Sequence, residues 1–196
     1  MSSSPLSPRV VHGALVCVDP ATLANSRVIT FPYNPETLTR TLESASPAPR
    51  PALQAQADLA AAPRQVIRFV LQLDATDQLE SPDRNPLAVQ FGVYPLLSAL
   101  EMLMYPPNTS EDALTLFAWG ANLLVPVRVA ELQIAGQLFD PRLNPIRAEV
   151  GVTLWVRTEA DFPPGSRLRK FWDEYFANLA KLAGLLPNGT LEKVRA

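Results

Sequence analysis

Short runs in which apolar and polar residues alternate are the feature that most constrains the fold of this chain. In the clearest run, RQVIRFVLQLDAT at 64–76, one side is wholly apolar and consists of Ile67, Phe69, Leu71 and Leu73. A two-residue period is typical of a β-strand with one buried face. The chain also has twenty prolines among its 196 residues, about twice the ordinary frequency. Because proline has no N–H to donate to a ladder, the sequence predicts a sheet of short strands.

Six or seven such strands are expected, at 9–19, 27–33, 37–43, 64–76, 113–120, 122–140 and 144–160. The last two are joined by DPRLNP at 140–145, which is rich in turn formers and predicts a long antiparallel hairpin. Leucines at helical spacing within 88–107 predict one central helix that stops at Pro106-Pro107. The mixture is typical of a mainly β (α+β) protein, an antiparallel barrel or sandwich with helical additions.

The segment SRLRKFWDEYFANLAKLAGLL at 166–186 predicts an amphipathic C-terminal helix. Its apolar stripe includes four aromatic residues, Phe171, Trp172, Tyr175 and Phe176. A helix of this kind normally packs on its own domain, but so many aromatic rings also suit a contact with a neighbouring subunit. The sequence leaves both interpretations open.

Composition along the chain predicts three parts. A flexible N-terminus at 1–8 precedes a β domain at 9–162, and a helical extension follows at 163–196. Within the β domain, residues 44–64 are a low-complexity Ala/Pro segment with almost no large apolar side chain. Such a segment buries too little surface to order itself, so we expect a mobile loop.

The stretch FPYNPETLTR at 31–40 interrupts a good strand with a Tyr-Asn-Pro corner and then resumes an alternating pattern. A ligand site, a strand crossover and a subunit joint would each need such a corner. No partner chemistry elsewhere supports a ligand site. We interpret Pro32 and Asn34-Pro35 as a strand edge that must not keep pairing, so that residues 37–43 can lie against a different neighbour, such as the next subunit. On this interpretation the corner is a joint.

The sequence offers little catalytic or metal-binding chemistry. His12 is the only histidine and Cys17 the only cysteine, which leaves no disulfide within the chain and no two-histidine metal centre. No nucleophile elbow, phosphate-binding glycine loop or dinucleotide fingerprint occurs. The acids that follow the clearest strand lack the glycine and spacing of a calcium loop; they are Asp74, Asp77, Glu80 and Asp83. We therefore expect no enzyme, cofactor or metal.

Charge and hydropathy exclude further classes of protein. The net charge of −2 disfavours a nucleic-acid binder. The first residues lack the pattern of a signal peptide, and no apolar run reaches the length of about 20 residues that spans a bilayer. A cytoplasmic protein without direct membrane insertion is expected. Charged residues make up only 18 % of the chain, which is lower than the ordinary quarter or so and suits a surface covered by partners.

Five motifs, in this order, resemble the tube-type baseplate protein of contractile injection systems, the phage-tail-like particles. In that family a strand ending in Phe-x-(Phe/Tyr)-Asn-Pro is followed by a Leu-x-Leu strand with an acid, a Pro-Pro pair, a Phe-x-Trp-Gly strand and a hairpin with an Asn-Pro-x-Arg-Ala corner. The matching residues are Phe31, Tyr33, Asn34 and Pro35; Leu71, Leu73 and Asp74; Pro106 and Pro107; Phe117, Trp119 and Gly120; and Asn144, Pro145, Ile146, Arg147 and Ala148. The resemblance covers residues 10 to 160, and the acid comes one residue early.

The resemblance implies a tube-like β-barrel that assembles, as six copies, into a ring. This ring would link the inner tube to the central spike of the baseplate and template tube assembly. The expected partners are further copies of the chain, the tube, the spike and other baseplate proteins. Many members carry a C-terminal LysM module, and none follows in this sequence, so functions of that module are not carried over.

Two alternatives stay open at this point. A related ring elsewhere in the particle, such as a tube-end adaptor, would share the motifs. A small closed barrel could instead hold an apolar ligand in its interior. For the subunit joint, the hypothesis centres on Arg147 at the hairpin corner and on Trp119 beside Gly120, although Trp119 also suits an ordinary core position.

Overall fold

The computed structural model describes residues 11–44, 62–105 and 114–187. Seven strands in these ranges form one antiparallel sheet with the order β2-β1-β5-β6-β7-β4-β3. The strands are β1 (Ala14–Val18), β2 (Asn25–Thr30), β3 (Leu38–Glu43), β4 (Arg64–Asp74), β5 (Leu114–Trp119), β6 (Leu123–Phe139) and β7 (Pro145–Val156). The expectation of a mainly β fold is confirmed.

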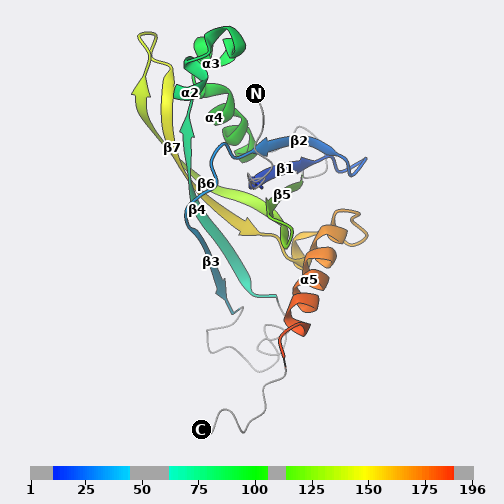
Figure 1. Ribbon diagram of the computed structural model, residues 1–196. Coiled ribbons are helices and arrows are strands. Elements are labelled where there is room, and N and C mark those ends of the chain that lie inside the picture. The colour runs from blue at the N-terminus through cyan, green and yellow to red at the C-terminus, as the bar shows by residue number, and fades with distance from the viewer. Residues whose placement is uncertain (1–10, 45–61, 106–113, 188–196) are drawn as a thin grey trace, which may run out of the picture.

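The sheet is open, and β2 and β3 are its two outer strands (Figure 1). Closure into the expected barrel is not detected among the described strands. The reason lies in the pairing, because β2 bonds to β1 and β3 bonds to β4, at opposite edges of the sheet. Residues 31–37 therefore carry the chain from one edge to the other as a strand crossover, and the role of the corner as a subunit joint stays a prediction. The neighbour of residues 37–43 is β4 of the same chain.

The long β6–β7 hairpin predicted around residues 140–145 is present. β6 pairs with β5 only over residues 123–127, whereas its pairing with β7 extends to Phe139. Beyond residue 127, the β5 side of β6 therefore has no strand partner among the described residues. Register shifts between Val129 and Glu131 and again near Gly136 bend this part of the strand.

The region after β4 differs from the prediction of one central helix. Two short helices, α2 (Thr76–Leu79) and α3 (Pro86–Phe91), precede α4 (Tyr94–Glu101). Gly92, with φ +58°, separates α3 from α4, a backbone conformation that a residue with a side chain rarely adopts. Pro106 and Pro107, where the helix was expected to stop, lie outside the described residues, as do residues 1–8 and 45–61 of the predicted loop.

A row of aromatic rings fills the interior. Phe31, Phe69 and Phe117 are almost fully buried, and neighbouring ring centroids lie 5.5 Å apart for Phe31–Phe69 and 5.4 Å for Phe69–Phe117. A second cluster covers the opposite face of β1 and β5 and includes Phe162 and Leu168, which lead into the C-terminal helix α5 (Arg169–Gly184). β1 is buried on both faces, and this explains its continuous apolar sequence ALVCV.

Candidate functional site

The side chain of Asn34 fastens the corner after β2 to the start of β1. Its Oδ1 accepts a hydrogen bond from the Gly13 N–H at 2.8 Å, and its Nδ2 donates to the Val11 carbonyl at 2.8 Å. Beside it, His12 Nδ1 donates to the Phe31 carbonyl at 2.9 Å, so the histidine has a structural partner. Asn34 thus continues the β1–β2 ladder with its side chain.

The remaining residues of the corner motif have different environments. Phe31 is a core residue, Pro35 is half-buried and Tyr33 is 46 % exposed. Of these, only Tyr33 offers a large apolar surface to a partner. The corner itself forms contacts within the chain, and those contacts account for its Asn and Phe.

Trp119 stands at the end of the aromatic row. Its ring stacks on Phe117 at a centroid distance of 6.1 Å, and it packs against the main core. Gly120 follows with φ +63° and opens the turn into β6. This environment favours the interpretation of Trp119 as a core residue, and its role in a subunit joint stays a hypothesis.

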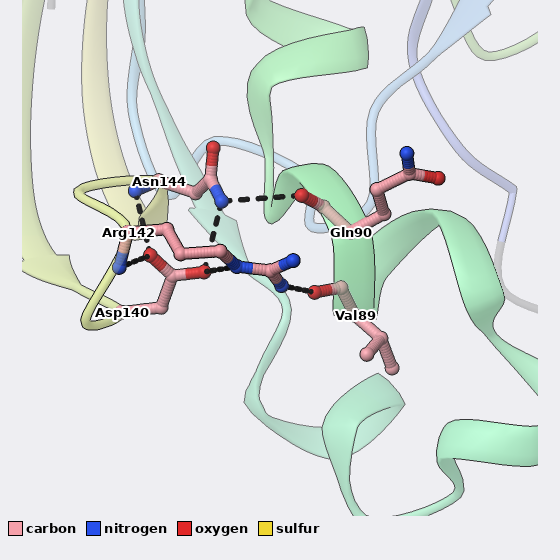
Figure 2. A network of polar contacts seen from close by, with 5 residues as sticks. All are labelled: Val89, Gln90, Asp140, Arg142 and Asn144. Atoms are coloured by element: carbon pink, nitrogen blue, oxygen red, sulfur yellow. Dashed lines mark hydrogen bonds and ion pairs between the residues drawn. The ribbon is translucent and has the colours of Figure 1, made fainter.

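A network of polar contacts holds the tip of the β6–β7 hairpin (Figure 2). One carboxylate oxygen of Asp140 accepts hydrogen bonds from the backbone N–H groups of Arg142 and Asn144, each at 2.8 Å. The other oxygen accepts from Asn144 Nδ2 at 2.9 Å. The Asn144 side-chain hydrogen bond is the largest of several contacts that lower the pKa of Asp140 against the opposing effect of desolvation. The turn between the two strands is therefore rigidly shaped by one carboxylate.

The same network ties the hairpin tip to α3. Arg142 donates to the Val89 carbonyl, and Asn144 Nδ2 donates to the Gln90 carbonyl at 3.1 Å (Figure 2). Immediately after α3, the Val93 N–H donates to the Pro145 carbonyl at 2.8 Å. Two predicted motif residues, Asn144 and Pro145, thus position the hairpin against the helices.

Arg147, the residue favoured for a subunit joint, forms an ion pair within the chain. Its Nε lies 2.7 Å from Asp74 Oδ2, and the two residues face each other across β4 and β7. Desolvation raises the pKa of Asp74, but hydrogen bonds from Thr76 and the charge of Arg147 outweigh it, so that the pKa lies below its usual value. The Arg147 side chain is still 49 % exposed, which leaves room for a partner.

The C-terminal helix is anchored by Tyr175. Its hydroxyl accepts from Arg40 Nη2 at 3.0 Å and lies 3.1 Å from the side-chain amide of the buried Gln65. Trp172 packs on the main core beside it, whereas Phe176 is 57 % exposed. Phe171 packs against the second cluster. The helix therefore packs on its own sheet through its first half.

Sequence reasoning missed the residues that join the elements: Gly92, Asp140, Arg142, Gln65 and Arg40. The only signal for them was the turn composition of DPRLNP, which indicated a turn but not its contact with α3. Asp140 has partners two and four residues away. The other four residues have partners or close contacts far away in the sequence.

Shallow hollows lie on the surface of the described part. One of about 260 Å³ lies on the sheet and is lined mainly by polar residues of β3, β4, β6 and β7. Another of about 170 Å³ lies beside α2–α4 and Pro32. Aromatic side chains fill the interior where a closed barrel would hold a ligand.

Within 11–44, 62–105 and 114–187, no group of three or more His, Cys, Asp or Glu side chains is arranged to hold a metal ion. No helix in the described part is both long and apolar enough to cross a membrane.

Residues 18–161 match the family described as contractile injection system tube protein. The chain belongs to this family. The matched region runs from the end of β1 to the turn after β7 and stops before α5. This contractile injection system tube protein is thus a structural component of such a particle, which confirms the coarser part of the resemblance. No curated protein matches the chain significantly.

Proposed function

We propose that this tube-family protein is a subunit of the baseplate, where six copies form a ring that links the inner tube to the central spike. In this role it has no catalytic activity and needs no cofactor. Its partners are further copies of itself, the tube, the spike and other baseplate proteins, and it binds neither nucleic acid nor membrane directly. Assembly takes place in the cytoplasm.

The observation that carries the proposal is the open sheet. Among the residues that the structure describes, β2 and β3 each have a strand neighbour on one side only, and β6 lacks one beyond residue 127 on its β5 side. Unpaired edges are costly for an isolated protein because they invite association with other chains. In a ring, an edge of one subunit can continue the sheet of the next, and the same contact repeats until the ring closes.

The mechanism is one of geometry. The hairpin is locked to α3 by Asn144, Arg142 and the Val93–Pro145 hydrogen bond, and the Arg147–Asp74 ion pair lies close to the hairpin tip. A rigid subunit of this kind would present a fixed pattern of edges on which tube subunits assemble. It would also pass load between the tube and the spike.

A ring at the other end of the tube is the second candidate, because the family match applies to it equally. A small-ligand carrier is disfavoured by the filled interior and by the open sheet.

Deletion of the gene in the producing cell, with complementation by a tagged copy, tests the proposal. We expect the tagged chain to co-purify with the particle and a label on the tag to lie at the spike end. In the deletion strain, negative-stain microscopy should find baseplates without tubes. Complete, contraction-competent particles without the chain would overturn the proposal. A label at the opposite end would establish the tube-end adaptor instead.

A further inference from the structure

The face of the sheet that points away from the main core carries a group of arginines around an exposed tryptophan. Trp155 on β7 is 45 % exposed, and the guanidinium carbon of Arg64 lies 5.1 Å from the centre of its ring. Arg128 on β6 is directly opposite Trp155, and Arg68 follows Arg64 on the same face of β4. We call these four residues the arginine patch. It lies on the half of β4 that runs beside β3 (Figure 1).

The arginines of the patch are not paired with acids within the described part of the chain. All three are exposed, and none of them forms a salt bridge with another described residue. Two acids lie at the margins of the patch, Glu43 opposite Arg64 and Glu131 opposite Thr153. A guanidinium carries its N–H donors in a planar fork that matches a carboxylate. Because no described carboxylate occupies these donors, they are available to a carboxylate from outside.

A hollow of about 260 Å³ adjoins the arginine patch on the same face of the sheet. Arg68 and Glu131 are among the residues that line it, and Gly151 on β7 lies among them without a side chain to fill it. The backbone does not require glycine there, because its φ lies outside the left-handed region and an added Cβ would come no closer than 3.5 Å to a neighbour, the Gln133 Cβ. Glycine also weakens the interior of a strand. The glycine therefore keeps the hollow open, although the packing would accept a side chain.

We propose that the arginine patch and the adjoining hollow bind a short acidic segment of a protein partner. Carboxylates of the segment pair with Arg68 and Arg128, an apolar side chain lies on the Trp155 ring, and the space above Gly151 admits the chain. Arginine and tryptophan are among the residue types that dominate the binding energy of protein interfaces. The surface lies on a face of the sheet and leaves its edges free, so it is compatible with the strand contacts proposed for self-assembly and does not depend on them.

Charge favours an acidic polypeptide over a nucleic acid as the partner. The three arginines contrast with the net charge of −2 of the whole chain, and a local positive field attracts carboxylates. A nucleic acid has a charged phosphate at every nucleotide and would continue past the patch toward Glu43 and Glu131, which repel it. A short segment with a few carboxylates avoids both acids.

Binding of a labelled peptide to the full chain tests the proposal. The probe is a fluorescein-labelled hexapeptide of alternating Glu and Leu. The corresponding Lys-Leu hexapeptide and a single-stranded oligothymidylate serve as comparison probes. Fluorescence anisotropy measures the affinity of each at about 0.15 M salt, where the attraction between distant exposed charges is largely screened.

Three substitutions alter the surface at exposed or open positions, and circular dichroism first establishes that each variant folds. Arg68→Ala and Arg128→Ala each remove one guanidinium, and Gly151→Gln fills the hollow from a position where a Cβ makes only ordinary contacts. Arg84→Ala is the matched control. Arg84 is also exposed and forms no salt bridge with another described residue, but it lies in the turn between α2 and α3.

We expect the wild type to bind the Glu-Leu peptide and each of the three surface variants to bind it about tenfold more weakly, since the loss of a hydrogen bond between charged groups has effects of this size. Arg84→Ala should bind as the wild type does. Absence of binding to the wild type would overturn the proposal, as would unchanged binding in any surface variant or equal weakening in Arg84→Ala.

Tighter binding of the oligothymidylate or of the Lys-Leu peptide than of the Glu-Leu peptide would also overturn the proposal, because the partner would then be of another class. These measurements are made in solution on the isolated chain. Their failure leaves the proposed ring intact, and complete particles in the deletion strain would overturn the ring without affecting the peptide site.

Discussion

The replacement of Gly92 by alanine should be among the most damaging single-methyl changes in this protein. Gly92 has φ +58° and lies against the backbone of the hairpin. A Cβ added there would come within 3.0 Å of the Pro145 carbonyl carbon and closer still to its oxygen. Because the obstacle is backbone, no side-chain rotation can relieve the overlap. Either α3 or the hairpin tip must move.

The expected cost has two parts. The positive φ costs an alanine about 1–2 kcal/mol. Separation of the two backbones also breaks the Val93–Pro145 hydrogen bond of 2.8 Å, which contributes about 1 kcal/mol. The free energy of unfolding should therefore fall by about 2–3 kcal/mol. For a chain of this size, that corresponds to a decrease in Tm of about 4–12 °C.

Two other glycines separate these effects. Gly120 has φ +63° but open space where a Cβ would be, so Gly120→Ala should cost only the backbone strain of about 1–2 kcal/mol and not the hydrogen bond. Gly184 lies in the last turn of α5 with nothing within 4 Å, and alanine there should stabilise the helix by about 0.5 kcal/mol. Urea unfolding followed by circular dichroism measures all three. If Gly92→Ala costs no more than Gly120→Ala, the close docking of the hairpin on α3 is wrong.

Three further substitutions test other contacts within the chain. Asn34→Ala removes two hydrogen bonds and should lower the free energy of unfolding, measured in urea, by about 1–2 kcal/mol. Asn34→Asp keeps only the acceptor and should lower it by about half as much. Equal stability of the wild type and both variants would contradict the role of Asn34 in fastening the corner to β1. Tyr175→Phe leaves Gln65 without its hydroxyl partner and should lower the free energy of unfolding by about 1–2 kcal/mol. Backbone hydrogen exchange in β3 should become faster. Unchanged exchange would show that α5 does not anchor β3. Since the pKa of Asp74 is lowered in the folded state, its stabilising contribution is complete at neutral pH and is lost as the pH falls below about 4, through the folded-state pKa. Unfolding curves measured against pH should show this loss in the wild type and a smaller one in Asp74→Asn. Identical pH profiles would show that the Asp74 carboxylate, with its contacts to Thr76 and Arg147, contributes nothing.

Local patterns predicted much of the fold. The alternation in RQVIRFVLQLDAT gave β4, DPRLNP gave the hairpin, and the apolar stripe gave α5. These features depend on residues close together in the sequence, so that one segment contains the whole signal. The corner at Asn34 was also recognised as a place where the chain changes its strand neighbour, because proline and asparagine act on the backbone next to them. It was interpreted as a subunit joint, and its neighbour within the chain, β4, was not predicted.

Contacts between distant segments were not predicted. Barrel closure was expected, but the partners of β2 and β3 lie at opposite edges, and single-strand patterns carry no information about partners. The break at Gly92 depends on the approach of Pro145, 53 residues later. Likewise, nothing in the sequence around Arg142 distinguishes it from an ordinary surface arginine, because its partner, the Val89 carbonyl, lies in a distant segment. The sequence indicated where the candidate site lies but not what holds it together.

A cryo-electron microscopy map of the intact particle tests the central claim most directly. It should contain a ring of six copies between tube and spike, in which an edge strand of each subunit, β2 or β3, continues the sheet of its neighbour. A ring position occupied by another protein, or subunits whose β2 and β3 edges both face solvent, would contradict the account.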